Sequence, residues 1–125
     1  MSVRAISLNA EFEKLTLFPS RTPETKADGW SSEVASYRNG GIFLVHYAGT
    51  GEWERHPHGD EIVFIVDGET TLTLLSDRGE ERTSLHSGQL VVIPSNVWHR
   101  FESPAPVKVL TVTPQPTDHS TARPE

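Results

Sequence analysis

Short runs of β-branched and aromatic residues, separated by turn residues, are the feature of this sequence that most restricts its fold. The runs lie at 42–48, 62–67, 70–75, 89–93 and 107–113. Each is the length of a typical strand and short for a helix. The turn residues Asp67-Gly68 and Asp77-Arg78-Gly79 both predict hairpins. No helical period separates the runs, so the pattern favours an all-β sandwich or barrel.

The strand pattern covers the middle of the chain and weakens towards both ends. Residues 1–40 carry little regular patterning, so we expect an N-terminal extension with a short strand or helix. Residues 114–125 contain three prolines and almost nothing apolar, which predicts a flexible C-terminal tail. The barrel itself is therefore expected over residues 41–113, as a single domain with one core.

Composition excludes several kinds of site and partner. The chain contains no cysteine, so a bound metal ion must be held by nitrogen and oxygen atoms. Its net charge is −6 and it has no cluster of lysine or arginine, which argues against binding to nucleic acid. No apolar run approaches the roughly 20 residues of a membrane helix, and no secretory signal is visible. We therefore expect a cytoplasmic protein that binds neither nucleic acid nor membranes.

Histidine and carboxylate side chains gather around the start of one expected strand. Residues two apart in an extended chain share a face, so Glu54, His56 and His58 can point the same way. Glu61 opens the next strand on its apolar face, where a buried carboxylate is costly unless it is paired. His99 supplies one more imidazole after a Pro-Ser-Asn turn. A divalent cation would offset the cost of burying Glu61, because imidazole and carboxylate are common ligands of such ions.

Two segments of the chain resemble the sequence motifs of the cupin superfamily. The motifs are written G(X)5HXH(X)3,4E(X)6G and G(X)5PXG(X)2H(X)3N. Gly88, Pro94 and His99 match the second motif in spacing. Asn96 stands in place of its glycine, a mild change because asparagine also tolerates positive φ, and Ser103 replaces its asparagine. The resemblance implies a double-stranded antiparallel β-barrel, or jelly roll, with a metal ion bound inside it.

Spacing decides which residues of the first motif are the expected ligands. Glu61, followed by six residues and Gly68, fits the end of the motif, and counting back places the histidine pair on Glu54 and His56. A pair at His56 and His58 would leave one residue too few before Glu61. We therefore prefer Glu54 to His58, because strand geometry makes spacing more informative than residue type. The expected metal ligands are Glu54, His56, Glu61 and His99.

The resemblance implies one divalent metal ion and a small-molecule ligand. Two imidazoles and two carboxylates favour Mn, Fe, Ni or Zn as the divalent ion. Cupins include dioxygenases, sugar isomerases and epimerases, and sensing domains, so the fold leaves the substrate open. We expect a metal-dependent enzyme of the oxygenase or sugar isomerase/epimerase type that acts on a small polar metabolite. The alternative is a non-catalytic module that binds or senses a small molecule.

Several expected strands are apolar on both faces, for example Leu90-Val-Val-Ile93. Such strands must be covered twice, on one side by a facing sheet and on the other by the barrel interior or a partner subunit. Together with the resemblance, this feature predicts a homodimer.

Overall fold

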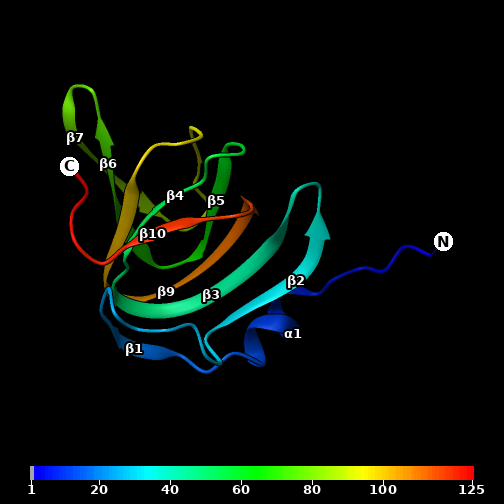
Figure 1. The fold of residues 1–125 in the computed structure, drawn as a ribbon. Helices are drawn as coiled ribbons and strands as arrows, with labels where there is room; N and C mark the ends of the chain where they lie inside the picture. Colours follow the sequence, from blue (N-terminus) through cyan, green and yellow to red (C-terminus); the bar gives the residue numbers. More distant parts are fainter. Residues whose placement is uncertain (1) are drawn as a thin grey trace.

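The computed structural model describes residues 2–125, and most of its regular structure is β-strand (Figure 1). In chain order the elements are α1 (Leu8–Glu13), β1 (Phe18–Arg21), β2 (Ser31–Tyr37), β3 (Gly40–Thr50), β4 (Trp53–Arg55), β5 (Glu61–Asp67), β6 (Glu69–Ser76), β7 (Gly79–His86), β8 (Leu90–Ile93), β9 (His99–Pro114) and β10 (Asp118–Ser120). Each expected apolar run coincides with a strand, which confirms the all-β prediction. Within residues 2–125 no helix has the length and apolar character needed to cross a bilayer.

Strand β9 joins two layers of sheet into a barrel. Its first residues pair with β6, and His99 also pairs with Glu54 of β4. Its later residues run between β3 on one edge and β5 on the other. One layer therefore has the order β2–β3–β9–β5–β8, and the other has the order β7–β6–β9–β4–β10. This arrangement is the jelly roll that the sequence predicts (Figure 1).

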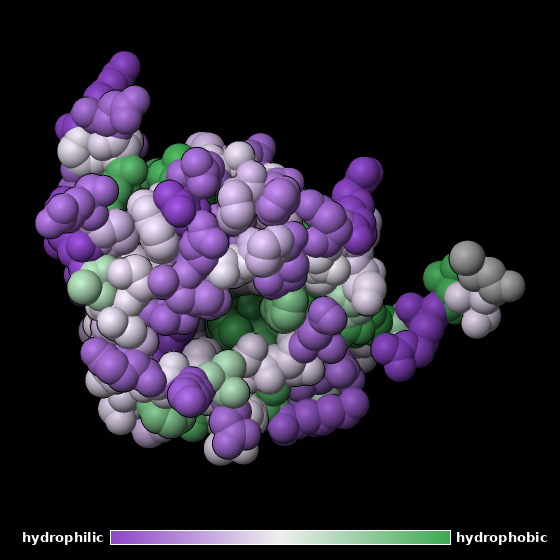
Figure 2. Space-filling view, viewed as in Figure 1, coloured by the Kyte–Doolittle hydropathy of each residue, from purple (hydrophilic) through white to green (hydrophobic). Residues whose placement is uncertain are grey.

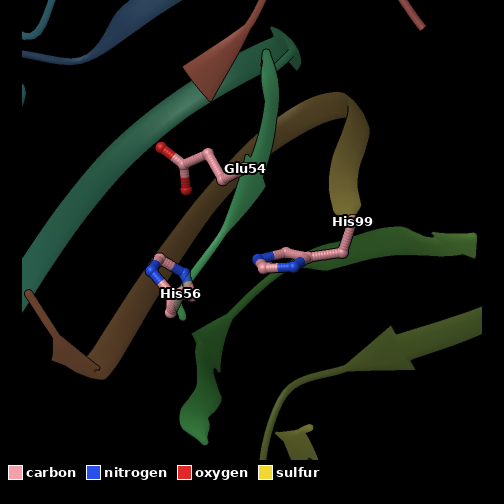
Figure 3. Close-up of side chains that lie close together, drawn as sticks. All are labelled: Glu54, His56 and His99. Carbon is pink, nitrogen blue, oxygen red and sulfur yellow. The ribbon is translucent and has the colours of Figure 1, made fainter. Parts of the chain in front are cut away.

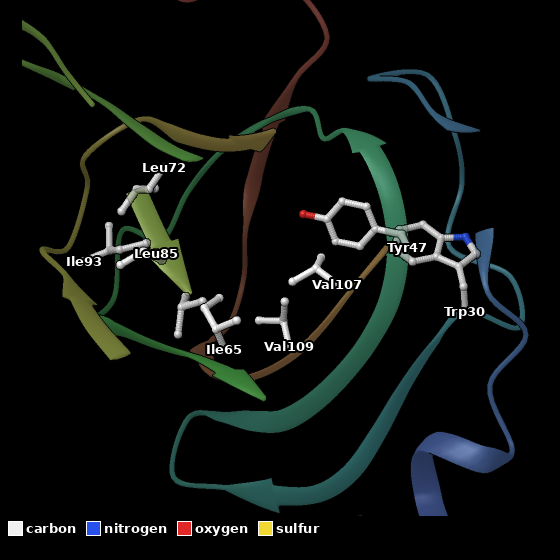
Figure 4. Close-up of a cluster of buried hydrophobic side chains, with 9 residues drawn as sticks. Trp30, Tyr47, Ile65, Leu72, Leu85, Ile93, Val107 and Val109 are labelled. Carbon is white, nitrogen blue, oxygen red and sulfur yellow. The ribbon is translucent and has the colours of Figure 1, made fainter. Parts of the chain in front are cut away.

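Side chains at alternate strand positions fill the interior of the barrel. In β5, Glu61, Val63 and Ile65 are buried on one face, whereas Ile62 is exposed on the other. The buried apolar cluster consists of Trp30, Tyr47, Val63, Ile65, Leu72, Leu85, Ile93, Val107 and Val109 (Figure 4). Burying one large aliphatic side chain stabilises the fold by about 1.5–3 kcal/mol, so this cluster holds the two layers together.

The turn at Asp67-Gly68 does not form the hairpin that the sequence predicts. Strand β5 is already paired with β8 on one edge and with β9 on the other, so β6 cannot add to it. The chain instead crosses to the other layer at Gly68, where φ is +99° and a Cβ would lie 2.6 Å from the backbone oxygen of Pro106. The turn at 77–79 does form its hairpin: β6 pairs with β7 along its whole length, and Ser76 lies opposite Gly79 next to the turn.

Both ends of the chain contribute to the fold. Strand β2 adds to the edge of β3, and α1 packs against β3 and buries Phe12. Strand β10 pairs antiparallel with β4, where Asp118 lies opposite Arg55 and accepts a hydrogen bond from it at 2.9 Å. Residues 118–120 of the C-terminal segment therefore have main-chain partners on β4, which the composition of the segment does not indicate, and the flexibility of the tail stays a prediction.

Candidate metal centre

Strands β4 and β9 bring three of the expected ligands together inside the barrel. Antiparallel pairing places Glu54 of β4 directly opposite His99, the first residue of β9. His56 follows β4, and the centroid of its ring lies 5.2 Å from that of His99. One ligand atom from each of Glu54, His56 and His99 lies within 4.8 Å of the other two. Figure 3 shows the three side chains directed into the same space.

Glu61 joins this group from the first position of β5. Its Oε1 atom lies 3.2 Å from Nε2 of His56 and 3.2 Å from Nε2 of His99. These three residues are at most 5% exposed to solvent. The two-residue period of β5, which the sequence predicts, is what turns this carboxylate into the barrel.

The histidine nitrogens next to Glu61 lack the hydrogen bonds that buried polar groups normally make. Within residues 2–125, Nε2 of His56 and Nε2 of His99 have no hydrogen-bond partner of acceptable geometry. Nδ1 of His99 can donate to the backbone oxygen of Val97 at 2.9 Å, which favours the tautomer with a free lone pair on Nε2. Neighbouring ligands of one ion lie about 3 Å apart when each is about 2.1 Å from the ion, which is close to the separations around Glu61. The residues present therefore fit a divalent metal ion.

The same contacts shift pKa values within the group. Burial alone would raise the pKa of Glu61, but the contacts with His56 and His99 lower it to about 2. Burial would lower the pKa of His99, but Glu61 reverses that effect and the pKa is raised. Burial and then the charge of Glu61 raise the pKa of Glu54. Glu61 therefore carries a fixed negative charge at neutral pH, which favours a cation beside it.

Threonine hydroxyls hold two of the candidate ligands from the side away from the centre. Oγ1 of Thr113 donates a hydrogen bond to Oε2 of Glu61 at 2.6 Å. Oγ1 of Thr117 lies 2.9 Å from Nδ1 of His56. Such contacts fix the orientation of a ligand and commonly change metal affinity when they are lost.

A histidine from the C-terminal segment also reaches the group. Nδ1 of His119 in β10 lies 2.6 Å from Oε1 of Glu52 and 3.5 Å from Oε2 of Glu54. Sequence reasoning missed both His119 and Thr117, because only the pairing of β10 with β4 brings them to the barrel. The composition of this segment contains no signal for that pairing.

The structure separates the two residues that compete for the fourth ligand position. Glu54 lies beside His56 and opposite His99, whereas the side chain of His58 is exposed and lies outside the group. Asn96 has a φ of +64°, as expected for a residue in place of a motif glycine, and its N–H donates to the backbone oxygen of His56 at 2.9 Å. Glu54, and not His58, therefore lies beside His56 and His99, and its role as a metal ligand stays a prediction.

A cavity of about 600 Å³ adjoins the group and opens at the surface. Figure 2 shows this hollow near the middle of one face, with apolar side chains visible inside it. Most of its exposed wall area is apolar, and residues from the loop after β1 and from the C-terminal segment also line it. A volume of this size suits a small organic molecule. The residues that line it include Phe43, Val45, Glu54, His56, Glu61, Phe101, Val109 and Thr113.

Comparison with known sequences identifies the family. Residues 41–113 match the sequence model of the family described as the cupin domain. Since this match covers more than half of the chain, the chain belongs to the cupin family. No curated protein matches the chain.

Solved structures share the fold at low sequence identity. A cupin-2 domain containing protein from Shewanella frigidimarina is 20% identical, with a TM-score of 0.66 over 88% of this chain and 94% of that one. A protein from Neisseria meningitidis is 19% identical, with a TM-score of 0.64 over 90% of this chain and 100% of that one. Hydroquinone 1,2-dioxygenase from Sphingomonas sp. TTNP3, with 4-hydroxybenzoate bound, is 20% identical, with a TM-score of 0.60 over 74% of this chain and 70% of that one. These similarities confirm the jelly-roll fold.

Proposed function

We propose that this chain is a metal-dependent enzyme that acts on a small organic molecule in the barrel cavity, with Glu54, His56, Glu61 and His99 holding one divalent ion. The observation that carries the proposal is the position of Glu61, whose Oε1 lies 3.2 Å from two buried imidazole nitrogens. Neither nitrogen makes a hydrogen bond within residues 2–125. A cation at this point would satisfy the carboxylate and both nitrogens together, which is otherwise costly in a buried site.

The side chains would hold the ion and keep its ligands in place. Two imidazoles and two carboxylates suit Mn(II), Fe(II), Ni(II) or Zn(II). When bound, such an ion supplies Lewis acidity that polarises a substrate oxygen, or a route to reaction with dioxygen. Thr113 orients Glu61, and the backbone oxygen of Val97 fixes the ring of His99. The apolar walls would exclude bulk water from the substrate.

The cavity walls favour oxygenation over sugar isomerisation as the reaction. Most of the exposed wall area is apolar, with Phe43, Val45 and Phe101 among the lining residues, whereas a sugar would need polar partners along its whole length. Thr111, Gln115 and Thr117 also line the cavity and offer hydrogen bonds to a polar part of the substrate. One protein of similar fold is hydroquinone 1,2-dioxygenase, whose structure holds the aromatic compound 4-hydroxybenzoate. Oxygen uptake by the Fe(II)-loaded protein with a panel of metabolites separates the two reactions, because isomerisation consumes no oxygen.

Metal analysis tests the proposed centre directly. Protein purified without chelator is expected to contain a divalent metal. The metal content of His56→Ala is expected to be lower by a factor of about ten or more, because a ligand is lost. His58→Ala is the matched control, since it removes an exposed imidazole two residues away and should keep the wild-type content. The measurement is inductively coupled plasma mass spectrometry after gel filtration. Equal metal in wild type and His56→Ala would contradict the proposal.

We further propose that two copies of the chain associate through the outer face of β5 and β8. Leu90 and Val92 on this face are 58% and 55% exposed, and Ile62 is paired with Val92 across the strands. A second copy would remove these adjacent aliphatic side chains from water. Light scattering at micromolar concentration is expected to give twice the chain mass for wild type and the single mass for Val92→Lys. A single mass for wild type would contradict the dimer.

A further inference from the structure

Arg21 places a guanidinium group in the wall of the same cavity. It is the last residue of β1, and parallel pairing of β1 with β3 sets it opposite Gly49. Its side chain lines the cavity that adjoins Glu54, His56 and Glu61. The N-terminal extension thus contributes a fixed positive charge to a barrel that is otherwise acidic on this side.

The guanidinium of Arg21 is held rigidly by its neighbours. Its Cζ atom lies 4.7 Å from the ring centroid of Trp30 and 4.7 Å from that of Tyr47. A Cβ on Gly51 would lie 3.0 Å from Nη1 of Arg21, so the guanidinium also packs closely against the backbone at this point. The indole N–H of Trp30 donates to the backbone oxygen of Lys26 at 3.1 Å, which fixes that ring in turn. An arginine positioned in advance loses little side-chain entropy when it binds a ligand.

Arg21 has hydrogen-bonding capacity that the protein leaves unused. Within residues 2–125 it forms no ion pair with a carboxylate, and its Nε atom is buried without a hydrogen-bond partner. Leaving a buried charged donor unpaired is costly. The planar guanidinium matches a carboxylate, which can accept two parallel hydrogen bonds from it.

The charges that line the cavity leave Arg21 without a counterpart once a divalent ion is present. Glu54 and Glu61 together balance such an ion. Glu52 is already in contact with His119 at 2.6 Å. At the exposed mouth, Glu24 and Lys26 have opposite charges. Among the cations of residues 2–125 that line the cavity, Arg21 is the one next to the apolar rings of the wall and without a carboxylate partner, so it is the group best placed to meet a negatively charged part of a ligand.

We propose that Arg21 binds the carboxylate of a small organic monocarboxylate, whose apolar body lies against the walls formed by Phe43, Val45, Phe101 and Val109. This inference names the substrate class of the proposed enzyme, and it rests on that proposed function where it calls the ligand a substrate. The binding step can be measured without turnover.

Two pairs of probes test the inference by isothermal titration calorimetry. Benzoate is compared with benzamide, and hexanoate with hexanamide, because each amide keeps the shape of its acid and removes the charge. In the wild type at least one acid is expected to bind about 10- to 100-fold more tightly than its amide, as for hydrogen bonds to a charged group. Arg21→Met keeps much of the side-chain bulk and should abolish this preference, Arg21→Lys should keep part of it, and the exposed-turn variant Arg78→Met should keep all of it.

Each outcome bears on the inference separately from the metal centre. The titrations are run on protein of measured metal content: an acid held by the ion would keep its preference in Arg21→Met, whereas an acid held by Arg21 would lose it. No preference in either pair, or a preference that survives Arg21→Met, overturns the inference. Tighter binding of phenyl phosphate than of benzoate overturns the assignment to carboxylates. A loss of metal in Arg21→Met without any change in acid preference would assign Arg21 to balancing Glu54 instead. Thermal unfolding of each variant confirms that it is folded.

Discussion

Glu61→Gln is expected to bind a divalent ion more than about 100-fold more weakly than the wild type while keeping its fold. Glutamine has the shape of glutamate but lacks the charge, so its amide oxygen is a much weaker donor and its amide nitrogen cannot coordinate a cation. Loss of a contact that merely orients a ligand commonly costs about 10- to 100-fold in metal affinity, so loss of a ligand should cost more. Competition with a chromophoric chelator measures the affinity, and thermal unfolding reports on the fold.

Two further variants distinguish a ligand role of Glu61 from a general effect of negative charge, and measure how much the hydrogen bond from Thr113 contributes. Glu69→Gln removes an exposed carboxylate from β6 and should leave the affinity unchanged. Thr113→Val keeps the side-chain shape but removes the 2.6 Å hydrogen bond to Glu61, and should weaken binding by about 10- to 100-fold. If Glu61→Gln binds metal as tightly as Glu69→Gln does, Glu61 is not a ligand.

The sequence predicts the barrel strands well because their side chains alternate between two environments. Glu61, Val63 and Ile65 are buried, with the residues between them more exposed, so the pattern of β5 reflects its packing directly. Strand β7 shows the opposite case. Almost all of its side chains are exposed, and it is held by main-chain pairing with β6 after the turn at 77–79. An edge strand of this kind needs no apolar pattern, and its position follows from the turn alone.

Contacts between distant segments are the part of the fold that local patterns cannot predict. The crossing at Gly68 is set by the pairing of β5 with β8 and β9, which depends on residues far along the chain. Strand β9 begins at His99 and runs through Pro104 and Pro106, although local composition indicates a strand only over 107–113. The pairing of β10 with β4 has no composition signal either.

The candidate site was predictable to the extent that strand geometry determines it. The two-residue period places Glu54 and His56 on one face, and the spacing to Glu61 selects Glu54 over His58. The pairing of Glu54 with His99 across β4 and β9 agrees with that selection. Thr117, His119 and Arg21 could not be foreseen, because each lies in a terminal segment that reaches the cavity only through pairing with β4 or β3.

Gly49→Ala is expected to lower the free energy of unfolding by more than about 2 kcal/mol. Gly49 lies against the backbone of Arg21, whose side chain lines the cavity, so the variant also tests how that side chain is positioned. Gly49 has a φ of +113°, which side chains rarely adopt, so alanine there is strained by about 1–3 kcal/mol. A Cβ would also collide with the backbone oxygen of Arg21 and would lie 2.6 Å from its backbone nitrogen. Neither backbone atom can move unless β1 shifts away from β3.

Gly79→Ala isolates the steric part of this effect, and urea unfolding measures both variants. Gly79 has a φ of +99°, but no atom lies within 4 Å of the position that its Cβ would take. Its replacement should therefore cost only the backbone strain, about 1–2 kcal/mol. Equal losses in the two variants would show that β1 does not press on Gly49. A larger loss in Gly49→Ala, together with a weaker preference for acids over amides, would show that the contact between β1 and β3 is what holds Arg21 in the cavity wall.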